Sequence, residues 1–598
     1  MNTETAPSTP PRWNLSDLFA SAEDPAIFET LTSVEHDARE FARRYAGCLA
    51  GLSSTELYET LREYERIRQT AVKPDAYASL LFAADASPEV GAFYQRVRET
   101  ATRATLPLLF LELELSRLGK EKLNALADAP PLAPYCHYLQ GVQNRAAFRL
   151  SEPEERVLEE TANTGRRAFI RLFEEITSNL RFEVAGRDGI LTLSQTLDLQ
   201  ESPDRRLRRA SADALTHGLQ AEGRTFTYIF NTLLQDKATE DRLRGLAYPE
   251  QGRHIANELT PEIVETVVQT SESGYGLVAR YYEAKRRVLD LPELAHYDRY
   301  APLLRPGDEE AIPYENGRAS VLSAFARFHP DYEAAGRSFF DNNWIDAEAR
   351  PGKRGGAFCA SATPDVHPFL FVNYLNKPGD VRTLAHELGH GIHYKLSGHQ
   401  SYLNFHSTLP MAEVASTFAE MLAFEGAQDA LTTDAARVAA LGERIEQSFA
   451  TVFRQTALYR FEQAIHQERR ERGELPTARY GELWQREIGK MFGSSVRLED
   501  GHACWWMYIR HFVATPFYVY AYTFGEMLAL ALFERYKNEG TAFVPQYLEM
   551  LRRGGSQSPA ELVAPLGVRL DEPTFWQGAV RLLEAEVTAF EKLIEKTP

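Results

Sequence analysis

The chain has 598 residues, enough for two or more conventional domains or for one large helical body with subdomains. Hydrophobic residues make up 44% of it and charged residues 25%, which is typical of an ordinary globular protein and excludes wholesale disorder. The formal net charge of -18 argues against nucleic-acid binding, because an acidic surface repels phosphate groups.

The N-terminal stretch, residues 1–11, is polar and rich in Pro and Thr, without the cationic start and apolar block of a secretory signal. The most apolar segment, residues 106–115, is short and carries Glu112 and Glu114. A membrane-spanning helix needs roughly 20 apolar residues, so none is predicted. The 4 cysteines lie far apart in the sequence and form no Cys-x-x-Cys pair. We therefore expect a cytoplasmic protein with no membrane association and no disulfide framework.

Most of the chain has apolar residues at the spacings of three and four that predict amphipathic helices. Ser202 precedes Pro203, and Thr260 precedes Pro261; each pair has the pattern of an N-cap residue followed by Pro at the first helical position. A mostly α fold is therefore predicted.

Strand signals are few, so we expect only a small β-sheet. Residues 181–184 and 190–193 flank Gly-Arg-Asp-Gly, which predicts a hairpin. Residues 369–374 are a second candidate, because they follow a breaker-rich stretch and precede Pro378-Gly379. We place the domain boundary near the hairpin, with an N-terminal helical domain at 1–195 and a catalytic domain at 196–598.

The motif that carries chemistry is His386-Glu387-Leu388-Gly389-His390. Residues four apart on a helix lie on one face, so the two imidazoles can bind one zinc ion from the same side. Glu387 would lie beside the metal, where it can accept a proton from water. Asp380 as an N-cap and the apolar spacing that follows it predict a helix here independently of the motif. A random match in a chain this long is expected only on the order of a few hundredths of the time, so we prefer a metal site.

Zinc in a catalytic site needs a third protein ligand and one open position. His393 lies nearly two turns from His386, so three imidazoles of one straight helix cannot converge on one ion. We interpret His393 as a packing residue or as a residue that supports a ligand. Metzincins have Gly where this chain has His393 and His where it has Leu396, so that class is excluded.

Residues 410–422 offer better ligands than His393. Pro410 suits a helix start, and Glu413 and Glu420 lie seven residues apart on one face of an otherwise Ala-, Met-, Phe- and Leu-rich helix. A carboxylate on such a surface needs a partner if it is buried. We predict Glu413 as the third ligand of a single zinc ion. Glu420 is predicted to hold an imidazole N–H, with a solvated Glu420 as the alternative.

These segments match a known family. The stretch Asp380-Val-Arg-Thr-Leu-Ala-His-Glu-Leu-Gly-His-Gly-Ile-His393 and the helix from Glu413 to Glu420 resemble oligoendopeptidase F of the thimet oligopeptidase family. Residues 13–19, 352–359, 367–374 and 511–522 give supporting matches, so the resemblance spans nearly the whole chain.

The resemblance implies a mostly helical bowl with a deep channel, zinc on the channel floor, and short unstructured peptides as substrates. It also implies that the strand at 369–374 edges the cleft and pairs with the substrate backbone. Phe371, Asn373 and Tyr374 are therefore predicted to bind substrate, together with Tyr520.

The resemblance also implies a histidine and a tyrosine that stabilise the tetrahedral intermediate. His511 matches the histidine, and Tyr522 is the preferred tyrosine, with Tyr518 and Tyr520 as alternatives. Thimet enzymes have a Gly-rich loop after the histidine, whereas this chain has Val513-Ala-Thr-Pro516. The departure leaves the choice of tyrosine and the flexibility of the loop open.

The sequence thus predicts a zinc endopeptidase that hydrolyses internal bonds of short peptides, with Glu387 as general base. A metallocarboxypeptidase that trims peptide C-termini is one alternative. A non-catalytic peptide-binding protein with a structural metal is another, although a structural site has no use for Glu387. Cleavage preference does not follow from the sequence, and both a monomer and a homodimer stay open.

Overall fold

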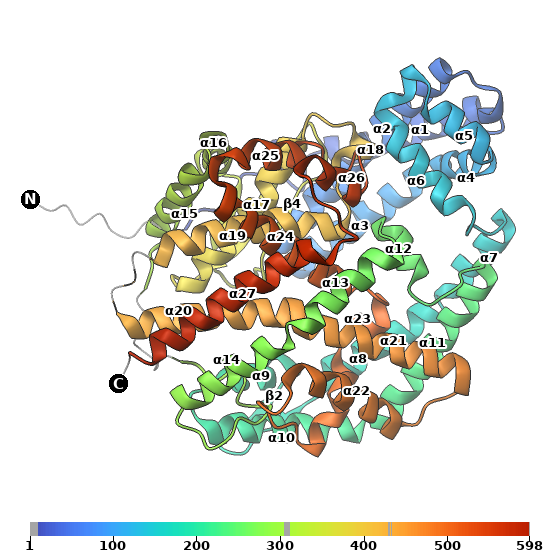
Figure 1. Cartoon of the computed structure of the whole chain (residues 1–598). Helices are drawn as coiled ribbons and strands as arrows, with labels where there is room; N and C mark the ends of the chain where they lie inside the picture. The colour runs from blue at the N-terminus through green and yellow to red at the C-terminus, as the bar shows by residue number, and fades with distance from the viewer. Residues whose placement is uncertain (1–9, 304–310, 429–430, 432, 597–598) are drawn as a thin grey trace, which may run out of the picture. The chain divides into compact units, whose positions relative to one another are not determined.

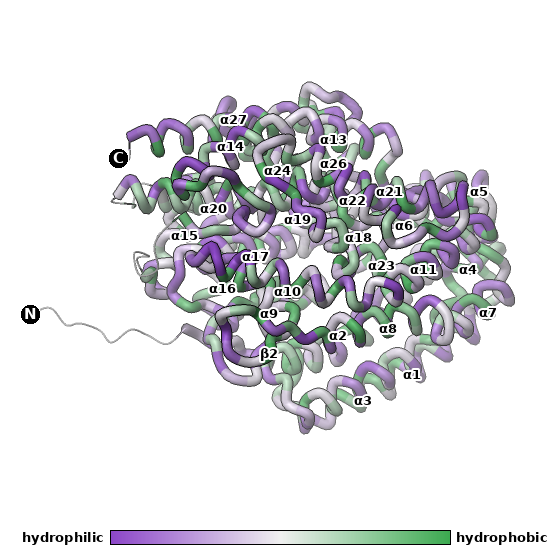
Figure 2. The backbone as a smooth tube through the Cα atoms, turned by 90° about the horizontal axis from the view of Figure 1, so that it is seen from below, coloured by the Kyte–Doolittle hydropathy of each residue, from purple (hydrophilic) through white to green (hydrophobic). Residues whose placement is uncertain are grey.

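The computed structural model describes residues 10–303, 311–428, 431 and 433–596, so most of the polar stretch at 1–11 lies outside the described residues. The described residues are predominantly helical and include a two-stranded and a three-stranded sheet (Figure 1). The predicted fold class, mostly α with little β, is confirmed. Green and purple alternate along the helices in Figure 2, as the amphipathic spacing of the sequence requires.

The chain divides into two compact units, each built from three separate stretches of sequence. The first unit comprises residues 1–147, 310–429 and 535–568; the second comprises 148–309, 430–534 and 569–598. The predicted functional division at residue 195 stays a prediction.

The helices and strands of the first unit are α1 (Ala26–Tyr45), α2 (Ser54–Ala84), α3 (Pro88–Thr105), α4 (Phe110–Arg117), α5 (Lys120–Ala127), α6 (Cys136–Ala146), α15 (Tyr314–Phe328), α16 (Pro330–Asp341), β3 (Ile345–Glu348), β4 (Phe358–Ala360), β5 (Phe369–Tyr374), α17 (Pro378–Ser397), α18 (Tyr402–Phe405), α19 (Leu409–Gln428), α25 (Val544–Arg552) and α26 (Pro559–Val563).

Those of the second unit are α7 (Glu152–Ala162), α8 (Arg166–Asn179), β1 (Phe182–Glu183), β2 (Ile190–Leu191), α9 (Leu193–Asp198), α10 (Arg205–Ala221), α11 (Gly223–Arg244), α12 (Gln251–Asn257), α13 (Pro261–Ser273), α14 (Tyr275–Val288), α20 (Asp434–Phe449), α21 (Gln455–Arg472), α22 (Thr477–Phe492), α23 (His511–Ala514), α24 (Tyr520–Glu539) and α27 (Pro573–Ile594). Helix α24 begins in this unit, and its residues from 535 onward are counted with the first.

The predicted strand at 369–374 is confirmed as β5. The strand order is β3-β5-β4, with β5 parallel to β3 and antiparallel to β4. The backbone at Leu370 and Phe371 is therefore paired on both sides within the sheet, so this part of β5 offers no free edge to a substrate strand. Strand β4 lies at the edge of this sheet instead.

An N-terminal segment covers one face of this sheet. The ring of Trp13 is 9% exposed and lies 5.6 Å from the ring of Phe371, 6.2 Å from Phe369 and 6.4 Å from Phe358. The segment also pairs by its backbone, since the amide of Ala347 donates to the carbonyl of Pro11 at 2.7 Å. Contacts between residues more than 300 apart in sequence thus fix strands β4 and β5.

Helices α17 and α19 lie side by side in the first unit (Figure 1). Gly389 permits their close approach, because a Cβ at this position would lie 2.5 Å from the carbonyl oxygen of Ala415 and 2.7 Å from Cα of Ser416. The helix at the motif was predicted to be capped by Asp380. It begins earlier, at Pro378, and the Asp380 side chain accepts from the amides of Leu375 and Lys377 at 2.6 and 2.9 Å. The carboxylate thus satisfies the amides before the first turn.

Local signals in the second unit are largely confirmed. Strands β1 and β2 form the predicted antiparallel hairpin. Thr260 caps α13 as predicted, with its side chain accepting from the amide of Ile263. The cap predicted at Ser202 is wrong: α10 is capped by Asp204, whose side chain accepts from the amide of Arg206 at 2.9 Å. A carboxylate stabilises a helix N-terminus better than a hydroxyl, because its charge adds to the hydrogen bond.

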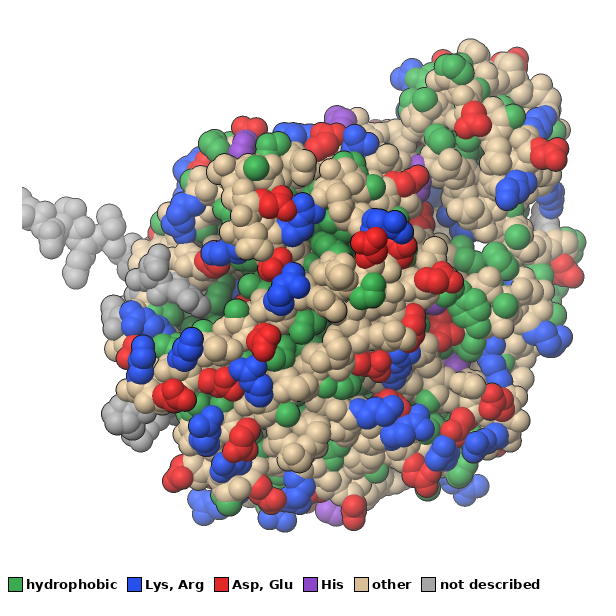
Figure 3. Space-filling model, viewed as in Figure 1, with side chains coloured by type: hydrophobic (Ala, Val, Ile, Leu, Met, Phe, Trp, Pro, Cys, Tyr) green, Lys and Arg blue, Asp and Glu red, His purple; other side chains and the backbone are tan. Residues whose placement is uncertain are grey.

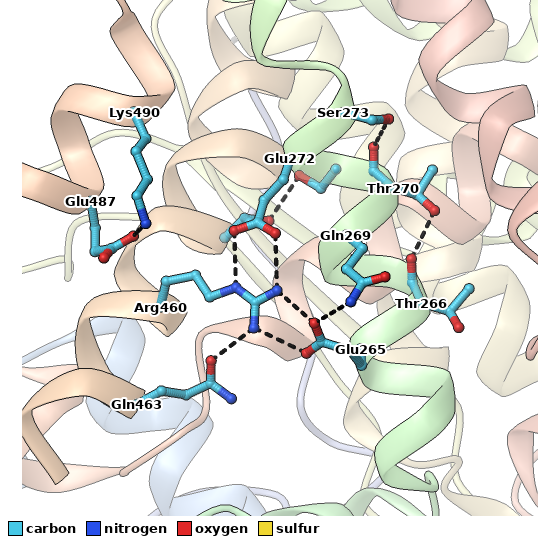
Figure 4. A network of polar contacts seen from close by, with 12 residues as sticks. Glu265, Thr266, Gln269, Thr270, Glu272, Ser273, Arg460, Gln463, Glu487 and Lys490 are labelled. Atoms are coloured by element: carbon cyan, nitrogen blue, oxygen red, sulfur yellow. Dashed lines mark hydrogen bonds and ion pairs between the residues drawn. The ribbon is translucent and has the colours of Figure 1, made fainter. Parts of the chain in front are cut away.

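A forked ion-pair network joins α21 to α13 (Figure 4). The guanidinium of Arg460 donates to both oxygens of Glu272, each at 2.9 Å. It also donates to both oxygens of Glu265, at 2.8 and 3.0 Å. Bidentate pairs of this kind fix geometry as well as charge, so the network sets the position of α21 against α13.

Acidic and basic side chains are interspersed over the face shown in Figure 3, although the sequence as a whole is acidic. Among the described helices, none combines the length and the apolar character that crossing a bilayer requires.

Candidate active site

Three predicted ligands converge in the first unit. Nε2 of His386 lies 3.6 Å from Oε2 of Glu413, and Nε2 of His390 lies 3.8 Å from the same oxygen. The two imidazole rings, one helical turn apart on α17, have centroids 5.1 Å apart. One donor atom from each of the three side chains lies within 4.8 Å of the others. Among the described residues, this is the group of three or more such side chains that could hold a metal ion.

The donor set fits zinc. Two imidazole nitrogens and one carboxylate oxygen form the His₂Glu set of catalytic zinc sites, which leaves a fourth position open. Tetrahedral ligands at about 2.1 Å from an ion lie roughly 3.4 Å from one another. The observed distances of 3.6 and 3.8 Å exceed this by a few tenths of an ångström. Small side-chain movements would therefore suffice to bind the ion.

The imidazoles are oriented by hydrogen bonds on their far sides. Nδ1 of His386 lies 3.2 Å from Oε2 of Glu420, and the other oxygen of Glu420 pairs with Nε of Arg382 at 3.3 Å. His390 makes a hydrogen bond to the backbone of Ala412. Such contacts fix the tautomer and the direction of a metal-binding imidazole. Glu420 is 4% exposed and directed at this imidazole, and its role in holding a metal ligand stays a prediction.

Glu387 projects from the same turn of α17 but is not one of the three convergent donors. Its side chain is 6% exposed, and Oε2 has no hydrogen-bond partner among the described residues. Burial raises the pKa of Glu387 to about 7, although the charge of His386 and a backbone hydrogen bond from Cys359 act in the opposite direction. An unsatisfied buried carboxylate is costly unless a ligand or water completes it.

The histidines of the metal-free protein differ in their preferred charge. Burial disfavours the cation of His386, but the hydrogen bond to Glu420 and the neighbouring carboxylates outweigh this and raise its pKa to about 9. Burial and the charge of His386 hold the pKa of His390 well below its usual range. His393 is 7% exposed, and burial lowers its pKa to about 4. It is not one of the three convergent donors and stacks on Tyr394, which agrees with the predicted packing role.

The side chains predicted to bind substrate from β5 are occupied within the protein. Phe371 is fully buried against Trp13 and Phe358. The hydroxyl of Tyr374 donates to the carbonyl of Ile312 at 3.0 Å. The side-chain amide of Asn373 donates to the carbonyls of residues 354 and 356, at 2.9 and 3.0 Å. These three residues hold the sheet and the loop before β4, so their predicted contact with substrate has no support here.

His511, Tyr518 and Tyr522 belong to the second unit and contact one another there. The Tyr522 hydroxyl lies 3.4 Å from Nε2 of His511. The Tyr518 ring stacks on His511 with centroids 5.9 Å apart and meets Tyr522 edge to face at 5.0 Å. Tyr520 is 1% exposed, and its hydroxyl accepts from the side chain of Asn257 at 2.8 Å. Of the three candidate tyrosines, the buried Tyr520 is thus the least suited to reach a substrate.

The sequence reasoning missed contacts made by backbone groups. The amide of Cys359 and the backbone of Ala412 contact Glu387 and His390, and no side-chain pattern announces either contact. Arg382 could have been found, since it lies four residues before His386 on the same helix face.

Comparison with known proteins agrees with this geometry. The family model described as peptidase family M3 matches residues 198–582, and the model described as oligopeptidase F matches residues 114–182. Oligopeptidase PepF of Bacillus subtilis is 27% identical over 98% of this chain and 87% of its own length. An oligoendopeptidase F homologue of Lactococcus lactis is 28% identical over 98% of this chain and 97% of its own length.

A solved structure shows the same fold. The oligoendopeptidase-F of Enterococcus faecium aligns with a TM-score of 0.70 at 22% identity, over 96% of this chain and 99% of its own. Because the family model covers more than half of the sequence and contains the convergent His386, His390 and Glu413, the chain belongs to peptidase family M3 and is a peptide-hydrolysing metallopeptidase.

Proposed function

We propose that the protein is a zinc-dependent endopeptidase that hydrolyses internal bonds of short, unstructured peptides. The convergence of His386, His390 and Glu413, with the buried carboxylate of Glu387 beside them, is the observation that supports this proposal. The names of the relatives, oligopeptidase and oligoendopeptidase, agree with it.

The three convergent side chains would hold one zinc ion. When bound, such an ion acts as a Lewis acid that lowers the pKa of a water molecule to about 7 and polarises a carbonyl group. Glu420 keeps Nδ1 of His386 engaged, so that Nε2 is directed at the metal position. Ser416 donates to Oε2 of Glu413 at 3.3 Å and steadies that carboxylate.

Glu387 is proposed as the general base. Its carboxylate would take a proton from the attacking water and pass it to the leaving amine. A proton acceptor works best when its pKa lies near the working pH, and burial raises that of Glu387 to about 7. His511 and Tyr522 are proposed to donate hydrogen bonds to the oxyanion that develops on the scissile carbonyl.

The test is the Glu387→Gln variant, assayed with an internally quenched peptide after its zinc content has been measured. We expect one zinc per chain and a loss of nearly all turnover, because Gln cannot accept the proton. The control is Glu425→Gln on α19, which makes the same chemical change at a surface residue paired with Lys537. Turnover of this control should equal that of the parent. Turnover close to the parent in Glu387→Gln would refute the base assignment.

A second measurement separates internal cleavage from trimming of C-termini. A peptide with an amidated C-terminus and the same peptide with a free carboxylate are digested side by side. An endopeptidase cleaves both, whereas a metallocarboxypeptidase requires the free carboxylate. Cleavage of only the free acid would contradict the proposal.

A further inference from the structure

The turn between α23 and α24, residues 515–519, holds a strained residue. Phe517 has φ of 58°, in the left-handed region that side chains other than Gly and Asn rarely adopt. It lies directly before Tyr518, whose ring stacks on His511. A residue persists in such a conformation only where the surrounding structure determines it. Contacts with the surrounding structure must therefore hold this turn in place.

The buried side chain of Glu462, in α21, binds the backbone of this turn. The amide of Phe517 donates to Oε1 of Glu462 at 2.7 Å, and both residues have an exposed fraction of 0%. On the preceding residue, Nε of Arg253 donates to the carbonyl of Pro516 at 3.3 Å. The Arg253 guanidinium also lies 5.7 Å from the centroid of the Tyr518 ring. The N–H and the C=O of the single peptide group between Pro516 and Phe517 are thus bound by α21 and α12, respectively.

One side of the turn borders a cavity of about 250 Å³. Residues 512–514, Pro516 and Phe517 line this cavity, and His466 faces it from α21. His466 is 2% exposed, and neither of its ring nitrogens has a hydrogen-bond partner among the described residues. The Phe517 ring packs on the His466 ring, with centroids 4.6 Å apart, so this ring contact and the hydrogen bond to Glu462 together hold the turn beside the cavity.

We propose that Glu462 is a positioning residue, which locks the turn so that Tyr518 and Tyr522 are held against His511. The turn fixes where the Tyr518 ring lies, and that ring contacts both His511 and Tyr522. This turn occupies the place where thimet enzymes have a Gly-rich loop, which the sequence of this chain lacks. This inference rests on the proposed role of His511 and Tyr522 toward the oxyanion.

The test compares Glu462→Met, which removes the acceptor, with Glu462→Gln, whose side-chain oxygen can still accept the Phe517 amide. Removing one oxyanion donor costs about 10²–10³ in kcat, so a misplaced donor should cost about 10- to 100-fold. We expect Glu462→Met to lose this much kcat with little change in KM, and Glu462→Gln to recover most of it. The matched control is Glu487→Met, because Glu487 is a buried carboxylate of the same unit, paired with Lys490 (Figure 4).

A double-variant comparison separates positioning from a general loss of stability. In a Tyr522→Phe background, Glu462→Met should lower kcat little further, because the group that it positions is already gone. If the kcat losses of the two single variants multiply in the double variant, the proposal is wrong. An unchanged kcat in the single variant Glu462→Met would also overturn it. Should Glu462→Met not fold, as judged by circular dichroism, Arg253→Met takes its place in the same comparison, with the same outcomes expected.

The kcat values of three single variants distinguish a wrong role for Glu462 from a wrong role for His511 and Tyr522. If His511→Ala and Tyr522→Phe keep the parent kcat, the proposed oxyanion role is wrong. If these two variants lose activity and Glu462→Met does not, only the positioning role of Glu462 is wrong.

Discussion

Replacing Gly389 with Ala should weaken zinc binding although the side chain binds nothing. Gly389 lies between Glu387 and His390, on the side of α17 that contacts α19. A Cβ there would lie 2.5 Å from the Ala415 oxygen, 2.7 Å from Cα of Ser416 and 2.8 Å from Cβ of Ala419. Two of these three atoms belong to the backbone, so a rotamer change cannot relieve the contact. The helices themselves must separate.

The separation follows from the contact distances. Restoring the 2.5 Å contact to an ordinary 3.4 Å requires a movement of about 0.9 Å. His386 and His390 move with α17 while Glu413 stays with α19, so the donor distances of 3.6 and 3.8 Å would grow to about 4.5 and 4.7 Å. We expect a cost of about 1–3 kcal/mol in the stability of the metal-free protein. Zinc affinity should fall by about 10- to 100-fold.

The assay measures zinc affinity by competition with a chromophoric chelator, and the stability of the metal-free protein by thermal unfolding. Gly489→Ala is the control, because Gly489 lies within α22 and a Cβ there would meet its nearest atom only at 4.0 Å. A Gly to Ala change inside an open helix should stabilise the protein by about 0.5–1 kcal/mol. A Gly389→Ala variant with the zinc affinity and melting temperature of the parent would show that the helix contact does not set the donor geometry.

Three further predictions concern supporting contacts. Glu420→Gln should lower zinc affinity by about tenfold, measured by the same chelator competition, because the charge that faces His386 is lost; equal affinity would contradict this. Arg460→Met should lower the unfolding free energy by about 1–3 kcal/mol in urea titrations, since it leaves two carboxylates unpaired at partly exposed positions; an unchanged midpoint would refute it. Trp13→Ala should lower the unfolding free energy by about 3 kcal/mol and make the N-terminal segment susceptible to limited proteolysis. Resistance to proteolysis equal to that of the parent would show that Trp13 does not hold this segment against the sheet.

The convergence of His386, His390 and Glu413 could be predicted because each step depended on local rules. The helical period places His386 and His390 on one face, and the need of a buried carboxylate for a partner identified Glu413. The hairpin and the cap at Thr260 were likewise encoded in a few adjacent residues. Local signals were not sufficient everywhere, since the caps predicted at Ser202 and Asp380 were wrong.

Other predictions were wrong where contacts with residues far away in the sequence determine the structure. Nothing in the residues of β5 states whether one or both of its edges are paired, so its central position in the sheet could not be read from the sequence. The side chains of Asn373 and Tyr374 turned out to bind backbone carbonyls of other segments. The strain at Phe517 was also hidden, because the residue type does not favour positive φ and its partner Glu462 lies 55 positions away.

The first unit is built from three separate stretches of sequence, which has a consequence for biosynthesis. Helix α17 contacts α25, which is translated much later. The ring of Phe418 in α19 stacks on Tyr547 at 4.3 Å, and the amide of Gly555 donates to the carbonyl of Asn404 in α18 at 2.8 Å. The ribosome must therefore synthesise nearly the whole chain before the helices that carry the proposed zinc ligands gain all their neighbours. A nascent or prematurely terminated chain would lack these contacts.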